Sequence, residues 1–178
     1  KLWPWAKIAA GKPVVVLAVR DEKSLRALAP RYWEGDGYRP TAIFVSGRDR
    51  HYALLRTDVR DSDDIGHNPY FTAYEAYLFL ALDQVFPSDS TPLWFERGLA
   101  QVLASAIVTD DEIQVGRPIH WKLETLRENP RLTIPDLVRV DRRSPYYTQE
   151  LQARVFDAQS WAFVHYLMYG EKRKYAPS

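Results

Sequence analysis

One change in the pattern of apolar residues, near residue 60, constrains the fold of this chain most. Before that point, short runs rich in β-branched residues are separated by charged and glycine-containing turns, as is typical of strands. From residue 68 onward, apolar and aromatic residues recur at helical spacing over stretches too long for single strands. This order predicts an α+β fold in one domain: a small mixed sheet within residues 1–60, then a helical part over residues 68–170.

The sheet-rich part contains three predicted strands and one short helix. Residues 13–19 form an almost continuous apolar run, which predicts a buried strand at the centre of the sheet. Asp21 is a suitable N-cap for a helix over residues 22–28. Residues 41–46 and 51–57 are strand-like and flank a turn-like stretch, so they predict a hairpin.

Two long helices follow each other closely in the helical part. Asn68 before Pro69 is a helix-start signal, and an unbroken apolar and aromatic stretch predicts a first helix over residues 70–86. Thr91 and Pro92 repeat that signal for a second helix, which ends at about residue 106. The shorter predicted elements are a strand at 112–115, helices at 121–128 and 135–140, and a closing helix at 155–169 before Gly170.

Composition excludes several classes of protein. The chain has no cysteine, so disulfides, thiolate metal sites and cysteine nucleophiles are all ruled out. Its 24 basic and 23 acidic residues give a net charge of +1, and this balance argues against nucleic acid or an anionic membrane as partner. No apolar run approaches the ~18 residues of a membrane-spanning helix.

The main functional signal lies at the second long helix. Residues 92–101 read PLWFERGLAQ. This stretch resembles the Pro-x-Trp-x-x-Glu-Gly-Leu-Ala-Glu segment of the bacterial peptidase-MA-like families, which are gluzincin-type zinc metallopeptidases. The glutamate of that segment is the third zinc ligand of the family, and Arg97 stands at its position here.

The first two zinc ligands of such peptidases are the histidines of a His-Glu-x-x-His motif, whose i, i+4 spacing places both on one helix face. Counting back 19 positions from Arg97, the separation expected in the family, gives Leu78, and four more positions give Tyr74. Residues 74–78 (YEAYL) therefore resemble the motif with both histidines replaced. Glu75 remains as a relic of the general base.

The resemblance covers nearly the whole chain, because residues 47–55, 115–118 and 158–167 resemble further stretches of these families. It implies a thermolysin-like core with a cleft between the sheet and the helices. It also implies an exported bacterial protein, periplasmic or extracellular. Where the families commonly carry a tyrosine before the last of these stretches, this chain has Asp157, so an aromatic hydroxyl is missing as well.

The replaced ligands predict a pseudopeptidase that holds no metal and no other cofactor. Leucine offers no lone pair and arginine stays cationic, so Leu78 and Arg97 are unable to bind zinc, and Tyr74 alone is not enough. Glu96 is disfavoured as a substitute ligand, because one residue corresponds to ~100° of rotation around the helix.

Two interpretations of Glu75 are open. It is either an idle relic or an acid that pairs with Arg97 across the two helices, in the space that zinc fills in the family. The pair is favoured, because a carboxylate there would otherwise lose its compensating dication.

The competing class of function is an active hydrolase that uses a relocated metal site or metal-free chemistry around Glu75. A relocated zinc site is disfavoured, because the four histidines include no i, i+4 pair. They are His51, His67, His120 and His165.

Aromatic side chains accompany the former metal site in the sequence. Tyr70, Tyr77, Trp94 and Phe95 are expected around it, either lining the cleft or packing in the core. The function most consistent with lost ligands is binding: a scaffolding or regulatory module that holds an unknown protein or peptide.

Overall fold

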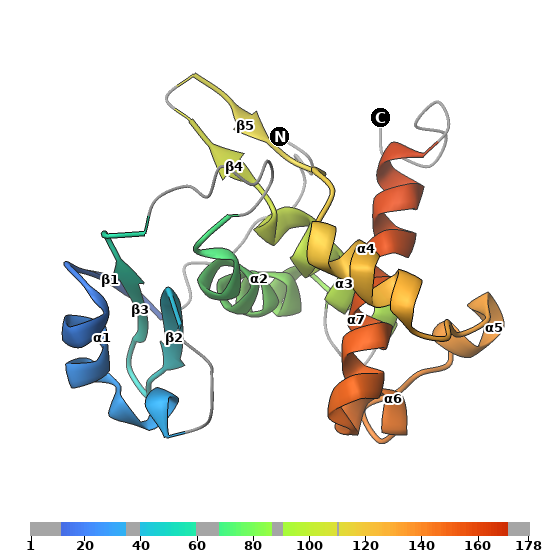
Figure 1. Cartoon of the computed structure of the whole chain (residues 1–178), viewed down its shortest axis with the longest axis horizontal. Helices are drawn as coiled ribbons and strands as arrows, with labels where there is room; N and C mark the ends of the chain where they lie inside the picture. Colours follow the sequence, from blue (N-terminus) through green and yellow to red (C-terminus); the bar gives the residue numbers. More distant parts are fainter. Residues whose placement is uncertain (1–11, 35–39, 60–67, 87–90, 110, 171–178) are drawn as a thin grey trace.

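The computed structural model of the chain describes residues 12–34, 40–59, 68–86, 91–109 and 111–170. A small mixed sheet comes first along the chain, and a set of helices follows it (Figure 1). The α+β fold class is therefore confirmed.

Three strands form the sheet: β1 (Val14–Val19), β2 (Ala42–Ser46) and β3 (His51–Arg56). Their order is β1-β3-β2, with β1 parallel and β2 antiparallel to β3. The predicted hairpin is confirmed, but the prediction that β1 is central was wrong, because β1 forms an edge. Its apolar run suggested burial on both faces, yet Val16 is 59% exposed.

One face of the sheet is covered by α1 (Glu22–Leu28) and a 3₁₀ helix (Pro30–Trp33). Asp21 caps α1, as the sequence predicts, because its Oδ1 accepts a hydrogen bond from the backbone N–H of Ser24 at 2.9 Å. Successive side chains along a strand point to opposite faces of the sheet. The face opposite α1 is turned toward the helical part, where α2 contacts β2 and β3. The core on the α1 side consists of Leu25, Ala29, Trp33, Ile43 and Leu54.

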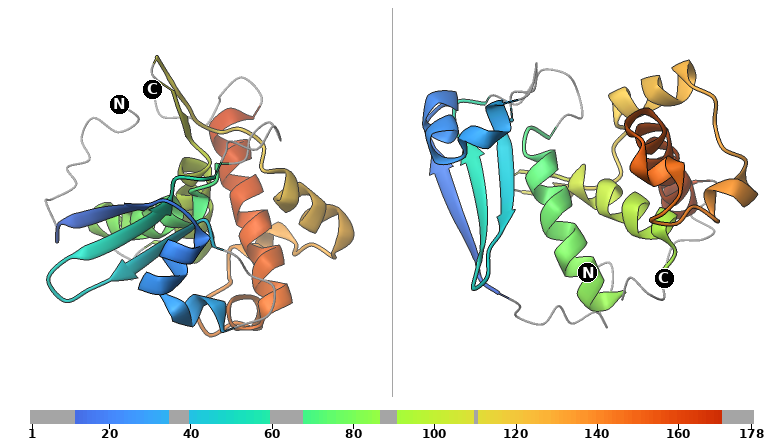
Figure 2. Two further views of the ribbon diagram at one scale, coloured as in Figure 1. Left: turned by 60° about the vertical axis from the view of Figure 1, so that its left-hand side comes forward. Right: turned by 90° about the horizontal axis from the view of Figure 1, so that it is seen from below.

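The longer described helices are α2 (Phe71–Val85), α3 (Leu93–Ala104), α4 (His120–Glu128) and α7 (Glu150–Tyr169). Figure 2 shows the sheet, α2, α3 and α7 as successive layers, in agreement with the contacts between these elements. The closing helix starts at Glu150, before the predicted start at residue 155. The prediction missed its first turn, because that turn is largely exposed and lacks the apolar pattern of a buried helix face. Shorter elements connect them: α5 (Ile134–Leu137), α6 (Pro145–Thr148), and a hairpin of β4 (Ile107–Val108) and β5 (Ile113–Gln114).

The contact between α3 and α7 is close enough to require glycine. A Cβ atom added to Gly98 would lie 2.3 Å from the carbonyl oxygen of Ser160 and 2.6 Å from Cγ2 of Val164. The glycine that follows Arg97 therefore lets the two helix backbones approach each other. As a result, α7 lies directly against the helix that carries Arg97.

Asn68 connects the start of α2 to the end of α3. Its Oδ1 accepts a hydrogen bond from the backbone N–H of Tyr70 at 2.9 Å. Its Nδ2 donates to the carbonyl oxygens of Ala104 at 3.0 Å and Ala106 at 3.2 Å. Asn68 lies two residues before the N-cap of α2, which is Tyr70, so the prediction that Asn68 caps this helix was wrong, because Pro69 and Tyr70 form a turn before the helix begins. Its amide instead satisfies carbonyl groups at and just after the end of α3. Among the described helices, none has the length and apolar character needed to span a membrane.

Candidate functional site

The motif positions on α2 and α3 lie between the sheet and α7. Tyr74 and Leu78, which are separated by one turn of α2, line a groove beside the sheet. Arg97 approaches α2 from α3, with its Cζ 4.8 Å from the ring centre of Phe79. The structure therefore places Glu75 where the charge of Arg97 acts on it, whereas Tyr74 and Leu78 line the groove, which neither Glu75 nor Arg97 borders.

Arg97 forms a bidentate ion pair with Asp157 of α7. Its Nε donates to Oδ1 at 2.9 Å, and its Nη2 donates to Oδ2 at 2.6 Å. The two side chains are 23% and 22% exposed, so the pair is largely shielded from solvent. Burial opposes the charged guanidinium, but the hydrogen bonds and charge of Asp157 outweigh it and raise the pKa of Arg97.

Glu75 is not the direct partner of Arg97 that the sequence predicted. Between the described side chains, the hydrogen-bonded ion pair of Arg97 goes to Asp157, and Glu75 acts on the guanidinium from farther away. Burial raises the pKa of Glu75, while the charges of Arg97 and Lys122 hold it down in part. The prediction was wrong about the partner, because Asp157 lies on a third helix whose position the two motifs do not reveal.

Lys122 of α4 is a member of this site that the sequence interpretation missed. It is 1% exposed, and its Nζ lies 4.3 Å from the ring centre of Trp121. Burial lowers the pKa of Lys122 to about 8, although the carboxylates of Asp157 and Glu75 favour its charged form. A signal was present, because Lys122 interrupts the apolar side of α4 next to Ile119 and Leu123.

We call Glu75, Arg97, Lys122 and Asp157 the charge cluster. The four residues come from four helices, α2, α3, α4 and α7, and their two carboxylates and two cations balance in formal charge. Neither the charge cluster nor the motif positions fit a zinc ion. Leu78 has no donor atom, and a dication near the cluster would face the cationic side chains of Arg97 and Lys122.

Among the described residues, the histidines do not come together at another site. His51 lies on β3, His120 begins α4, and His165 of α7 makes a 2.7 Å hydrogen bond with the carbonyl oxygen of Gly116. His67 lies outside the described residues. In the part of the chain that the structure describes, no three His, Cys, Asp or Glu side chains are placed to hold a metal ion.

A groove of about 1060 Å³ lies between α2, the free face of the sheet and the β4–β5 hairpin. Among its described lining residues, Lys12 carries the one formal charge. The charge cluster does not line this groove, which is larger than two other pockets of about 480 and 110 Å³. Its apolar lining includes Val14, Val16, Ala53, Leu55, Leu80, Leu103, Val108 and Ile113.

The aromatic residues expected around the site have different positions. Tyr77 lines the groove and is 44% exposed. The hydroxyl of Tyr70 instead donates to the carbonyl oxygen of Arg56 at 2.9 Å, which joins the start of α2 to the end of β3. Trp94 and Phe95 pack among other rings and core side chains, so their position corresponds to the core alternative.

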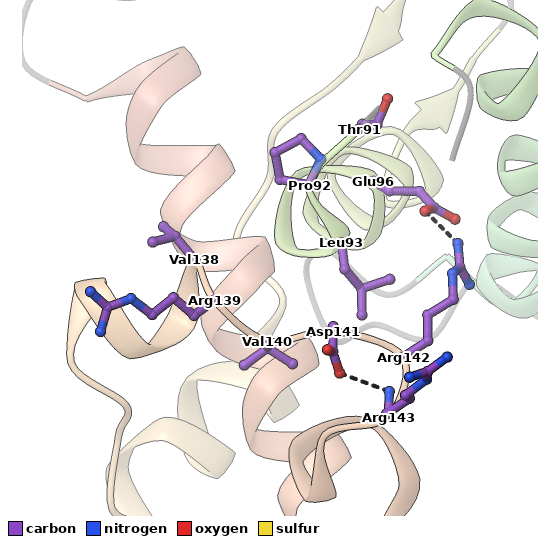
Figure 3. A pocket seen from close by; sticks show the side chains of 10 residues that line it. All are labelled: Thr91, Pro92, Leu93, Glu96, Val138, Arg139, Val140, Asp141, Arg142 and Arg143. Atoms are coloured by element: carbon purple, nitrogen blue, oxygen red, sulfur yellow. Dashed lines mark hydrogen bonds and ion pairs between the residues drawn. The ribbon is translucent and has the colours of Figure 1, made fainter. Parts of the chain in front are cut away.

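Glu96 pairs with Arg142 of the segment before α6. Figure 3 shows it directed toward Arg142, and its Oε2 accepts a hydrogen bond from Nη2 of that arginine at 2.8 Å. The two residues border a smaller pocket of about 480 Å³ between the start of α3 and residues 138–143. This pairing explains the position of Glu96 without a role as a metal ligand.

Compared with protein-family models, with curated proteins and with solved structures, the chain gives no significant match. The relation to gluzincin peptidases therefore stays a prediction from the motifs.

Proposed function

We propose that this chain is a pseudopeptidase of the gluzincin type, which binds a peptide segment of a partner protein in the groove beside α2. The supporting observation is the ion pair between Arg97, at the position of the third zinc ligand, and Asp157. A guanidinium held by a carboxylate in a cluster of balanced charge occupies the place of the third zinc ligand and leaves no electron-pair donor there for a metal ion. The thermolysin-like architecture and an exported bacterial origin belong to the same proposal and rest on the motifs.

The groove suits a binding role. It is as large as sites that hold sizeable ligands, and apolar side chains dominate its lining. Tyr74 and Leu78 contribute apolar surface at the positions of the two histidines. A site that binds without reacting has no need for donors there, and apolar surface adds affinity.

The competing proposal, a metal-free hydrolase around Glu75, draws support from the raised pKa of this carboxyl group, which is common in general acids and bases. Against it, Glu75 is surrounded by the charge cluster and does not line the groove. A general base has to reach the proton that it removes.

One binding experiment and one hydrolysis experiment test the proposal. The probe is the apolar peptide dansyl-Ser-Leu-Phe-Leu-Ser-amide, which is titrated into the full chain. Ile113→Asp and Val16→Asp each place a charge in the groove from an exposed position, so we expect ~10-fold weaker binding. Leu28→Asp is the matched control, because Leu28 is equally exposed on α1, which covers the opposite face of the sheet.

Hydrolysis is measured with a quenched fluorescent casein peptide, together with the metal content of the purified protein. We expect no cleavage above buffer. Stoichiometric zinc with cleavage that a chelator abolishes would contradict the proposal. Metal-free cleavage that Glu75→Gln abolishes would favour the competing hydrolase.

A further inference from the structure

A free edge of the sheet borders the groove beside α2. Among the described residues, β1 pairs with a strand on one side only, so its other side is an edge of the sheet (Figure 2). The strand reads VVVLAV and contains none of the charged residues or prolines that usually protect an exposed edge. Six residues of edge are therefore open to pairing with a further strand.

The backbone groups at this edge belong to every second residue of β1. The carbonyl oxygen of Pro13 accepts a hydrogen bond from the backbone N–H of His51 on β3 at 2.9 Å. Because successive residues of a strand direct these groups to opposite sides, the residues that direct N–H and C=O to the free side are Val14, Val16 and Ala18. Val14 and Val16 also line the groove, so a strand added here would lie beside it.

The end of the edge where β1 begins is positively charged. Nζ of Lys12 donates to the carbonyl oxygen of Gly47 at 3.3 Å, and no carboxylate in the described part of the chain pairs with it. His51 lies opposite Val14 and also lines the groove. Its Nδ1 is shielded from solvent and has no hydrogen-bond partner among the described residues. A cation and an unused ring nitrogen favour an anionic oxygen at this end.

We propose that the partner peptide binds as an additional strand on β1, with its C-terminal carboxylate beside Lys12. This inference rests on the proposed peptide-binding function of the same groove. A peptide that ends where β1 begins runs antiparallel to it. Main-chain hydrogen bonds to the edge supply affinity, and every second side chain of the peptide points into the groove. The partner is therefore an extended C-terminal segment with apolar residues at alternate positions.

Methylation of single peptide nitrogens tests the strand pairing. The probe is dansyl-Ser-Leu-Ser-Leu-Ser-Leu with a free carboxylate, which is titrated into the full chain. Its leucines face the groove in the proposed register, so their N–H groups point to β1. Methylating the nitrogen of the second leucine should weaken binding ~10-fold. The matched control is methylation of the serine nitrogen just before it, which points away from β1 and should change the affinity less than ~2-fold.

The position of the carboxylate is tested with the same peptide as a C-terminal amide. We expect the amide to bind ~5-fold more weakly than the acid, because it loses a charged interaction with Lys12. Lys12→Met should remove this difference. Lys23→Met is the control, because Lys23 is exposed on α1, which covers the opposite face of the sheet, and the difference should persist there.

Two results would overturn the inference and leave the proposed function standing: equal binding of the two methylated peptides, or equal binding of acid and amide, while Ile113→Asp still weakens the affinity. If none of these peptides binds, methylated or not, the proposed function itself fails. A dimer of the full chain that Val16→Asp dissociates and that excludes the peptide would assign the edge to a second copy and also refute the inference.

Discussion

Arg97, at the position that the motif prediction assigns to the third zinc ligand, forms a bidentate ion pair with Asp157. Each replacement alone would leave a poorly solvated charge, because both side chains are about four-fifths shielded from solvent. Together they neutralise each other, and their charges act on two further groups, Glu75 and Lys122. Asp157 therefore has a structural role of its own, as the ion-pair partner of Arg97.

Breaking this pair is expected to destabilise the protein clearly. Arg97→Met or Asp157→Asn should each lower the free energy of unfolding by about 2 to 3 kcal/mol, because the partner is left unpaired in a largely shielded place. The double variant Arg97→Met/Asp157→Asn should cost less than the sum of the single changes. Urea unfolding measures all three, and additive effects would contradict the pairing. The control is Arg154→Ala on the exposed Glu150–Arg154 pair, for which we expect a change within about 0.5 kcal/mol.

Lys122 should make stability depend on pH in an unusual window. Its pKa is about 8 in the folded chain and 10.5 ordinarily, so between these values the unfolded chain binds more protons at this residue. The contribution of Lys122 to the free energy of unfolding therefore increases as the pH rises from 8 to 10.5, by up to about 3 kcal/mol. Lys122→Met removes this dependence.

The measurement compares unfolding of the unmodified chain and Lys122→Met at several pH values from 7 to 10. The difference in stability should shift in favour of the unmodified chain as the pH rises. A difference that is constant over this range would show that Lys122 titrates as an ordinary lysine.

At the scale of elements, the crossing of α3 and α7 depends on Gly98. Replacing a helical glycine with alanine normally stabilises a helix by up to about 1 kcal/mol. Here the added methyl group would overlap a backbone carbonyl of Ser160, so we expect Gly98→Ala to destabilise the protein by about 1 to 3 kcal/mol. The sign of the change in thermal unfolding decides the matter, since a stabilised variant would mean that the helices are farther apart.

The sequence predicts local features of these elements well and long-range ones poorly. Asp21 was identified as the cap of α1, because a cap depends on a few neighbouring residues. The edge position of β1 was missed, because strand order depends on pairing between distant segments. Arg97 was singled out by its motif, but its partner Asp157 is 60 residues away in the sequence.

At the scale of the whole molecule, the helical layers and the groove have separate tasks. The charge cluster joins four helices through their facing sides, whereas the groove lies on the other side of α2 against the sheet. Tyr74 and Leu78 line the groove, and Glu75 between them belongs to the cluster. Substitutions in the charge cluster are therefore expected to change the free energy of unfolding more than the affinity for a peptide in the groove.

Rebuilding a metal site tests whether these layers have the geometry of a gluzincin. Tyr74→His, Leu78→His and Arg97→Glu supply the ligands, but they leave Asp157 without its partner and next to new negative charge. The threefold variant should therefore be less stable without metal than a fourfold variant that also carries Asp157→Asn. Zinc should raise the denaturant midpoint of the fourfold variant, because it binds the folded chain alone.

A matched control moves one histidine off the shared face. Tyr77→His replaces Tyr74→His, so that the two histidines become neighbours along the chain at 77 and 78, which point in different directions on a helix. Micromolar zinc, followed by calorimetry and by the shift in midpoint, should stabilise the fourfold variant and leave the control unchanged. Equal responses would mean that zinc binds without regard to the helical spacing, and the gluzincin geometry of α2 and α3 would then have to be abandoned.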